Sequence, residues 1–274
     1  VPEPLSEGDS LTVFQIAVLA VIQGITEFLP VSSSGHLALT PVLLGWKDQG
    51  LALDVAVHVG TLGAVMVYLW RDIWSVLRGL LRLTTGRVDE GAKLAWLVLV
   101  SSIPVIIAGF LIKAYVGDTM RSAAIIGWAF IGFGILLYLA DRSGLTIHRI
   151  THMTTGNALL IGIAQAFALI PGASRAGTTI TMARMLGFER REAARFSMLM
   201  SIPAILGAGV LLGKDVLESG DSVLQANVIL AAALAFFAAL IAIAAMMYWL
   251  QRQSYTPFVA YRLLLGVIIV WYAV

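Results

Sequence analysis

Two polar clusters interrupt an otherwise apolar chain, and the first has the residue types of a hydrolytic site. It reads Gln-Gly-Ile-Thr-Glu-Phe-Leu-Pro-Val-Ser-Ser-Ser-Gly-His and runs from Gln23 to His36. Gln23 and Glu27 are four residues apart and share one face of a helix that Pro30 would end. A carboxylate within an apolar stretch is costly and indicates function. The cluster therefore offers a nucleophile, Ser33, beside two candidate bases, Glu27 and His36.

A structural interpretation of the same residues stays open. Ser32 and its neighbours can cap the following helix by accepting backbone N–H bonds, and Glu27 can simply pair with an arginine. Asp54 and His58 also stand at i, i+4 spacing. Two ligands are a weak metal signal, so a buried hydrogen-bonded pair is the better interpretation of them. His148 and His152 are assigned no role.

The second cluster, Pro-Gly-Ala-Ser-Arg-Ala-Gly-Thr-Thr, has the character of an anion site. A Gly-rich turn that opens a helix directs backbone N–H groups to one place. Arg175 is always charged and bidentate, which suits a pyrophosphate better than a lysine would. Ser174, Thr178 and Thr179 are either further phosphate ligands or helix caps. Arg262, about a turn and a half into the last apolar stretch, is a candidate second phosphate clamp, although a long arginine there can also reach lipid headgroups.

The elements that hold these clusters must be membrane helices. The chain has 274 residues, 59% hydrophobic and 12% charged, with mean hydropathy +0.90. Its net charge of +2 arises from basic residues scattered over short loops, which argues against a nucleic-acid partner. There is no cysteine, which excludes disulfides and thiolate metal sites.

Apolar segments near 20 residues long, enough to cross a bilayer as helices, recur along the chain. Six full spans are predicted: 51–70, 93–113, 121–140, 193–213, 226–249 and 257–274. Regions 11–44 and 156–187 are broken by Pro, Gly and Ser, and broken backbone does not face lipid. We expect an all-α polytopic membrane protein with six transmembrane helices plus two re-entrant helix-loop-helix hairpins, in one domain over 1–274.

The charges also predict an orientation, because Lys and Arg concentrate in cytoplasmic loops. With both termini outside, twelve basic residues fall on the cytoplasmic side and four outside. The four are Lys47, Lys113, Arg121 and Lys214. The acidic segments 1–10 and 215–221 also fall outside, and the first has no basic region typical of a cleavable signal peptide.

The two broken regions resemble each other. AVIQGITEFLPVSSSGH and GIAQAFALIPGASRAGTT share Gln, Pro, Ser and Gly in the same order, and SIPVIIAG at 102–109 is similar to SIPAILGAG at 201–209. Such self-similarity is typical of inverted-topology repeats with a site at their interface. The expected repeats are about 11–140 and 156–274, with a chance match left open.

QGITEFLPVSSSGH together with PGASRAGTT resembles the undecaprenyl pyrophosphate phosphatase family, the bacterial enzymes associated with bacitracin resistance, over the whole chain. The resemblance implies functional roles for the following residues: Gln23, Glu27, Ser32, Ser33, His36, Ser174, Arg175, Thr179 and Arg262. Two departures stand out. Gln23 takes an amide where other members have a carboxylate, which argues against a base or obligatory metal ligand there. Ala176 replaces a serine, so that hydroxyl is not essential here.

The resemblance implies hydrolysis of undecaprenyl pyrophosphate to undecaprenyl phosphate and inorganic phosphate, which recycles the cell-wall lipid carrier and gives bacitracin resistance. It also implies a divalent cation, Mg2+ or Ca2+, with Glu27 as a candidate ligand. The expected location is the bacterial inner membrane, with periplasmic termini and a site that opens to the periplasm. A homo-oligomer is left open.

Two mechanisms remain open. Ser33 attacks the phosphorus, with Glu27 or His36 as its base, or else one of those two groups activates water directly. Two other function classes are also compatible with broken helices inside a membrane, namely a secondary transporter and a lipid flippase. The nucleophile beside Glu27 favours the enzyme, because a passive anion site has no need of one.

Overall fold

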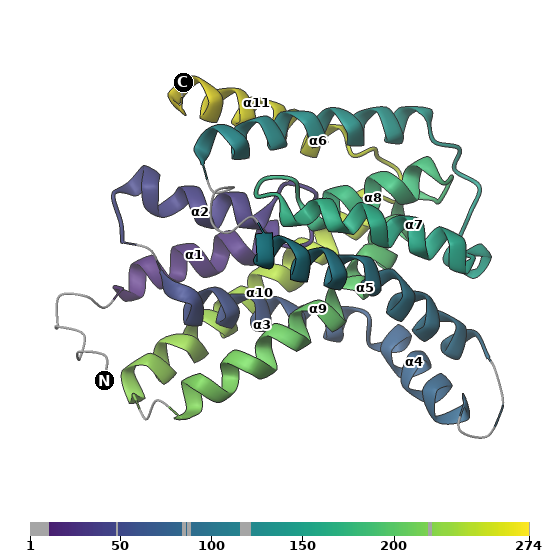
Figure 1. Ribbon diagram of the computed structural model, residues 1–274, viewed down its shortest axis with the longest axis horizontal. Helices are drawn as coiled ribbons and strands as arrows, with labels where there is room; N and C mark the ends of the chain where they lie inside the picture. The colour runs from purple at the N-terminus through teal and green to yellow at the C-terminus, as the bar shows by residue number, and fades with distance from the viewer. Residues whose placement is uncertain are drawn as a thin grey trace.

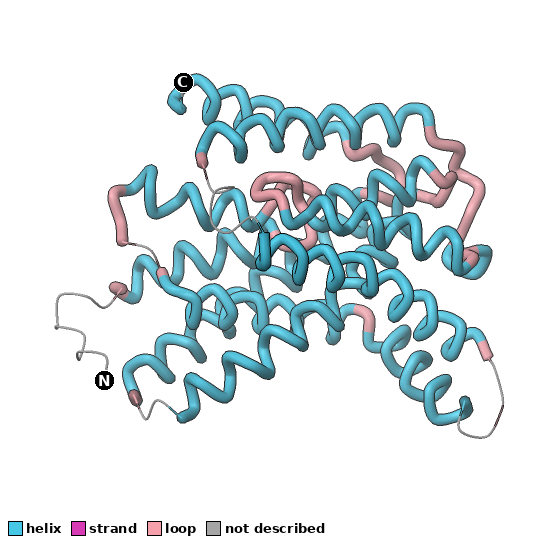
Figure 2. Tube along the Cα trace, in the orientation of Figure 1, coloured by secondary structure: helices cyan, strands magenta, loops and turns pink. Residues whose placement is uncertain are grey.

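The computed structural model describes residues 11–47, 49–83, 86, 89–115, 122–218 and 221–273. Every regular element in those residues is a helix, apart from one isolated bridge between His148 and Phe188 (Figure 2). The predictions that concern segment 1–10, Arg87, Arg121 and residues 219–220 lie outside the described residues. The same holds for the side chains of Lys113 and Lys214.

Five of the described helices are long and apolar enough to cross a membrane. They are α3 (Gly50–Tyr68), α5 (Glu90–Tyr115), α6 (Ala123–Ser143), α10 (Ser222–Trp249) and α11 (Thr256–Ala273). They correspond to five of the six predicted spans. The sixth, 193–213, lies in α9 (Arg190–Glu218), a helix of 29 residues that opens with Arg-Arg-Glu. The chain is therefore an all-helical polytopic membrane protein.

The stretch after residue 70, for which the sequence predicts no span, is helical in the structure. It forms α4 (Trp70–Leu83), which packs against α5 and projects at the lower right of Figure 1. Charged and apolar residues alternate at helical spacing there, so the segment is amphipathic. Asp89 caps α5 by accepting from the Ala92 N–H at 2.9 Å. The hydrogen bond from Ala92 makes the largest contribution to lowering the pKa of the Asp89 carboxyl below its usual range, and the hydrogen bond from Arg82 makes the next.

The two broken regions form pairs of short helices. They are α1 (Val13–Thr26) and α2 (Ser33–Leu44), then α7 (Thr155–Ala166), the single turn η3 (Phe167–Leu169) and α8 (Arg175–Met185). Their α-helices have 11 to 14 residues. At 1.5 Å per residue, the longest spans about 21 Å, less than a hydrocarbon core of about 30 Å. The turn of the second pair lies near the centre of the molecule (Figure 2).

The two turns have the same local structure. Ser32 and Ser174 both have φ = 72°, and they are the only non-glycine residues with positive φ in the described part of the chain. Each caps the next helix: Ser32 Oγ accepts from the Gly35 N–H at 3.3 Å, and Ser174 Oγ accepts from the Gly177 N–H at 3.0 Å. A left-handed serine costs about 1–2 kcal/mol. Tertiary packing must therefore hold both turns in place.

A buried ionic cluster ties α6, α8 and α9 together. Asp141 Oδ1 accepts from Arg184 Nε at 3.0 Å and from Arg190 Nε at 2.7 Å, and its Oδ2 accepts from the Tyr255 N–H at 3.1 Å. Arg184 is one of the twelve basic residues that the charge count places on the cytoplasmic side, and the structure buries it completely in the last turn of α8. Its charge is tolerated there because a carboxylate and several carbonyls surround it.

Small residues bring α3 and α1 close to α10. A Cβ added at Gly60 would lie 2.1 Å from the Ala232 carbonyl oxygen, and one at Gly24 would lie 2.7 Å from that of Ala235. Without a hydrophobic driving force between membrane helices, such close backbone contact supplies much of the packing energy.

Gly60→Ala is therefore expected to destabilise the protein by about 1–3 kcal/mol, because α3 and α10 must separate to admit the methyl group. The measurement is thermal unfolding in detergent. Gly132→Ala is the matched control, since Gly132 lies in a helix with nothing within 4 Å of the added Cβ and alanine is the better helix former. Equal melting temperatures for the two variants would contradict the close-packing argument.

Candidate active site

A cavity of about 390 Å³ opens where the α1–α2 turn meets the α7–α8 turn. Its polar lining consists of Glu27, Ser33, Ser34, Asp54, His58, Gln165, Ser174 and Arg175. Its apolar lining consists of Leu51, Val55, Val105, Ala168, Leu169, Ala204 and Ile205. One part of the cavity therefore suits a charged group, and another part suits hydrocarbon.

Glu27 is the centre of the polar part and is 7% exposed. Its Oε2 accepts from Ser33 Oγ at 2.7 Å and from Gln23 Nε2 at 2.8 Å, while its Oε1 accepts from Arg175 Nη2 at 3.0 Å. Arg175 follows Glu27 by 148 positions in the chain. The structure thus brings the two polar clusters of the sequence together on one carboxylate.

Arg175 is held in a fixed position. Its Nη1 donates to the Ser197 carbonyl at 2.9 Å, and its guanidinium lies 5.8 Å from the centre of the Phe28 ring. Its side chain is 16% exposed and lines the cavity. The guanidinium is thus fixed by the Ser197 carbonyl through one nitrogen and contacts Glu27 through the other. This arrangement is suited to hold an anion beside Glu27.

The two threonines of the second cluster do not line the cavity. Thr178 Oγ1 donates to the Arg175 carbonyl at 3.1 Å, and Thr179 Oγ1 lies 2.7 Å from Ser197 Oγ and 2.8 Å from the same carbonyl. Both are buried within the helix packing. These contacts, like the Ser174 cap, match the structural alternative that the sequence left open.

The histidine that the sequence singled out lies elsewhere. His36 Nδ1 donates to the Ser32 carbonyl at 2.7 Å, and its Nε2 is 2.6 Å from the Tyr261 hydroxyl. The two rings are stacked, with an interplanar angle of 7°. His36 does not line the cavity, and both of its nitrogens are engaged, so the structure offers no route from His36 to Ser33.

A different histidine faces Glu27. His58 Nε2 is 3.6 Å from Glu27 Oε2, and its Nδ1 donates to the Asp54 carbonyl at 2.6 Å. The predicted hydrogen bond between His58 and Asp54 is present, but its acceptor is the main chain. The i, i+4 spacing of Asp54 and His58 within a predicted span was the sequence signal for this part of the site. Nothing in the sequence indicated that His58 would lie beside Glu27.

Arg262 is fully buried and lies outside the cavity. It donates to the Pro30 carbonyl of the first turn at 3.1 Å, and to the Gly172 and Ala173 carbonyls of the second at 3.0 and 3.1 Å. Its remaining contacts go to carbonyls of α6. Turns between helices leave carbonyls unpaired, and one guanidinium with five N–H groups satisfies several of them. Arg262 therefore ties the two turns together, and its three nitrogens all donate to the main chain.

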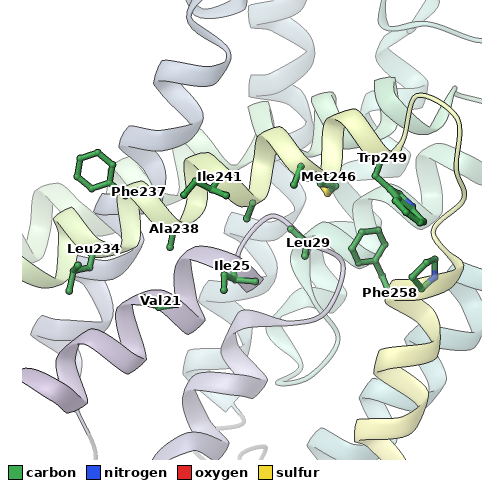
Figure 3. A pocket seen from close by; sticks show the side chains of 13 residues that line it. Val21, Ile25, Leu29, Leu234, Phe237, Ala238, Ile241, Met246, Trp249 and Phe258 are labelled. Atoms are coloured by element: carbon green, nitrogen blue, oxygen red, sulfur yellow. The ribbon is translucent and has the colours of Figure 1, made fainter.

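A larger groove of about 700 Å³ lies on another face, between α1, α10 and the start of α11 (Figure 3). Val21 and Ile25 face it from α1, and Phe237 and Ile241 face it from α10. None of the described residues that line it is charged. It therefore has no group that could carry out hydrolysis, and the smaller polar cavity is the candidate active site.

Comparison with known proteins gives the same family as the sequence motifs. The model of the family described as bacitracin resistance protein BacA matches residues 16–268. An undecaprenyl-diphosphatase of Roseobacter denitrificans is 52% identical over 265 residues, which cover 96% of this chain and 99% of that protein. Undecaprenyl-diphosphatase 1 of Rhodospirillum rubrum is 51% identical over 263 residues, 93% of each chain. The chain belongs to the bacitracin resistance protein BacA family.

Proposed function

We propose that this protein is an undecaprenyl-diphosphatase, which releases inorganic phosphate from undecaprenyl pyrophosphate and regenerates undecaprenyl phosphate. The observation that carries the proposal is the shared carboxylate: Ser33 and Arg175, from turns far apart in the chain, both donate to Glu27. A nucleophile, its base and an anion-binding group thus meet in a cavity that also has an apolar part. That combination suits a charged headgroup on a lipid tail.

In the favoured mechanism, Ser33 Oγ attacks the terminal phosphorus while Glu27 accepts the hydroxyl proton. A bond forms between Oγ and phosphorus, the bridging P–O bond breaks, and undecaprenyl phosphate leaves. Water then cleaves the phosphoserine and releases inorganic phosphate. Arg175 neutralises part of the charge on the transferred group, which is the main demand of phosphoryl transfer. In the competing mechanism, Glu27 activates the water directly and Ser33 only binds phosphate.

A divalent cation would fit this cavity in part. Carboxylate oxygens are the ligands that Mg2+ and Ca2+ prefer, and Glu27 and Asp54 both line the cavity. Among the described residues, no group of three or more His, Cys, Asp or Glu side chains is arranged to hold a metal ion. We therefore propose that these two residues supply part of the ligand set and the pyrophosphate oxygens the rest. When bound, the cation would neutralise charge on the phosphates.

We further propose that α9 is a sixth span and that α1–α2 and α7–α8 are re-entrant hairpins of two inverted repeats. The shortness of their helices and the shared geometry of Ser32 and Ser174 support this arrangement. The bias of basic residues supports periplasmic termini, and the family resemblance implies a periplasmic opening.

The test is phosphate release by the purified protein in nanodiscs, supplied with a polyprenyl pyrophosphate and Mg2+. We expect inorganic phosphate and lipid monophosphate in equal amounts, and a loss of rate when the cation is chelated. Glu27→Gln should lower kcat by about 10²–10⁴-fold, since the amide cannot accept the proton. Glu189→Gln, which changes a half-buried carboxylate paired with Arg149 outside the cavity, is the control and should match wild type. Transfer of intact lipid across the membrane without phosphate release would instead support a flippase.

A further inference from the structure

Gln165 is one of the polar side chains of the cavity that have no role in the mechanism above. Gln165 stands in the last turn of α7, lines the cavity and is 1% exposed. Neither its Oε1 nor its Nε2 has a hydrogen-bond partner among the described residues. In that part of the chain it is the only buried side chain with both of its polar atoms unpartnered. Buried polar groups are nearly always paired, so an amide like this one requires an explanation.

The first hairpin shows what the same amide does when a partner is present. Gln23 precedes the capping residue Ser32 by nine positions, and Gln165 precedes Ser174 by nine as well. Gln23 Nε2 donates to Glu27, four residues further on. The residue four positions after Gln165 is Leu169, which offers no acceptor in its side chain. The Gln23 amide therefore has a hydrogen-bond partner within its own hairpin, whereas the equivalent Gln165 amide can hydrogen-bond to a ligand.

A buried amide without a partner is destabilising, because it has lost its hydrogen bonds to water and gained none in return. A ligand that restores them must offer an acceptor to Nε2 and a donor to Oε1. Phosphoryl oxygens are acceptors, and water or a protonated phosphate oxygen is a donor. The rest of the polar lining already includes Arg175, so a neutral amide adds a donor for phosphate without adding charge.

We propose that Gln165 is a substrate-binding residue whose Nε2 donates to a phosphoryl oxygen of the lipid pyrophosphate, while its Oε1 accepts from water bound with the headgroup. This inference rests on the proposed function and extends the site to α7, which places Gln165 beside Ser33, Glu27 and Arg175 around one headgroup.

Two variants test the proposal. Gln165→Met keeps the length of the side chain and removes both polar atoms; we expect kcat/KM for a polyprenyl pyrophosphate to fall about 10–100-fold, the usual effect of losing a hydrogen bond to a charged group. Its melting temperature without substrate should equal or exceed that of wild type, because an unpaired buried amide has been removed. Gln165→Glu should lose more activity, since a carboxylate repels phosphate. Gln15→Met, an amide in the first turn of α1 outside the cavity, should keep wild-type kcat/KM.

The outcomes distinguish a failure of the proposed role of Gln165 from a failure of the proposed phosphatase function. If wild type releases phosphate and both Gln165 variants stay within twofold of its kcat/KM, the role of Gln165 is wrong and the phosphatase stands. If Gln165→Met loses activity and melting temperature together, or does not fold, the amide is structural and the proposal is overturned. If wild type itself releases no phosphate, the proposed function fails, and the substrate role of Gln165 fails with it.

Discussion

Ser33→Ala is expected to lower the rate of phosphate release by about 10³-fold or more, the scale of loss seen when a catalytic nucleophile is removed. The reason is geometric: Ser33 Oγ lies 2.7 Å from Glu27 Oε2 and lines the cavity, so its proton already has an acceptor. The control is Ser143→Ala, because Ser143 is exposed and its hydroxyl donates to the helix carbonyl of Leu139. The measurement is kcat in nanodiscs.

The same variant decides between the two mechanisms. Rapid quenching of wild type with substrate labelled on the terminal phosphate should trap a phosphoserine at Ser33, and Ser33→Ala should trap none. If active wild-type protein never becomes labelled and Ser33→Ala keeps a rate within tenfold of wild type, the covalent mechanism is wrong and direct attack by water is favoured.

Arg175→Ala is expected to lower kcat/KM by about 10²–10³-fold, because the arginine stabilises charge that develops on the transferred phosphoryl group. Arg175→Lys should recover only part of that loss, since lysine keeps the charge but not the planar fork that contacts both Ser197 and Glu27. Arg252→Ala, an exposed arginine after α10, is the control and should match wild type.

Melting temperatures of variants at Arg175 and Glu27 distinguish the role of the ion pair in stability from its role in catalysis. Removing Arg175 leaves Glu27 buried without its cation, which should lower the melting temperature. Adding Glu27→Gln to Arg175→Ala should restore much of that stability without restoring activity. A double variant that regains phosphate release would mean that Arg175 serves only to neutralise Glu27.

Much of this site could be predicted from the sequence because its first half is local. Glu27 and Ser33 are six residues apart on either side of Pro30, so a helix ended by that proline brings carboxylate and hydroxyl together. The lengths of the apolar segments likewise predicted six spans, and five of them match helices long and apolar enough to cross a membrane, because the thickness of the hydrocarbon core sets the length of such a helix. The internal repeat predicted a site where the two broken regions meet, and in the structure the ion pair between Glu27 and Arg175 joins those regions.

Other features depended on which helix packs against which, and local spacing does not specify that. His36 was one of two candidate bases, with Glu27, but the position of α11 places Tyr261 on its ring, and the packing of α3 brings His58 rather than His36 to Glu27. Arg262 was expected to bind phosphate, and its environment of main-chain carbonyls exists only where two turns and α6 meet. Composition and spacing thus determined the residues available for chemistry and the lengths of the helices that carry them. Tertiary packing alone decided which of those side chains face the cavity, because the direction of a side chain is set by helix rotation and by contacts distant in the chain.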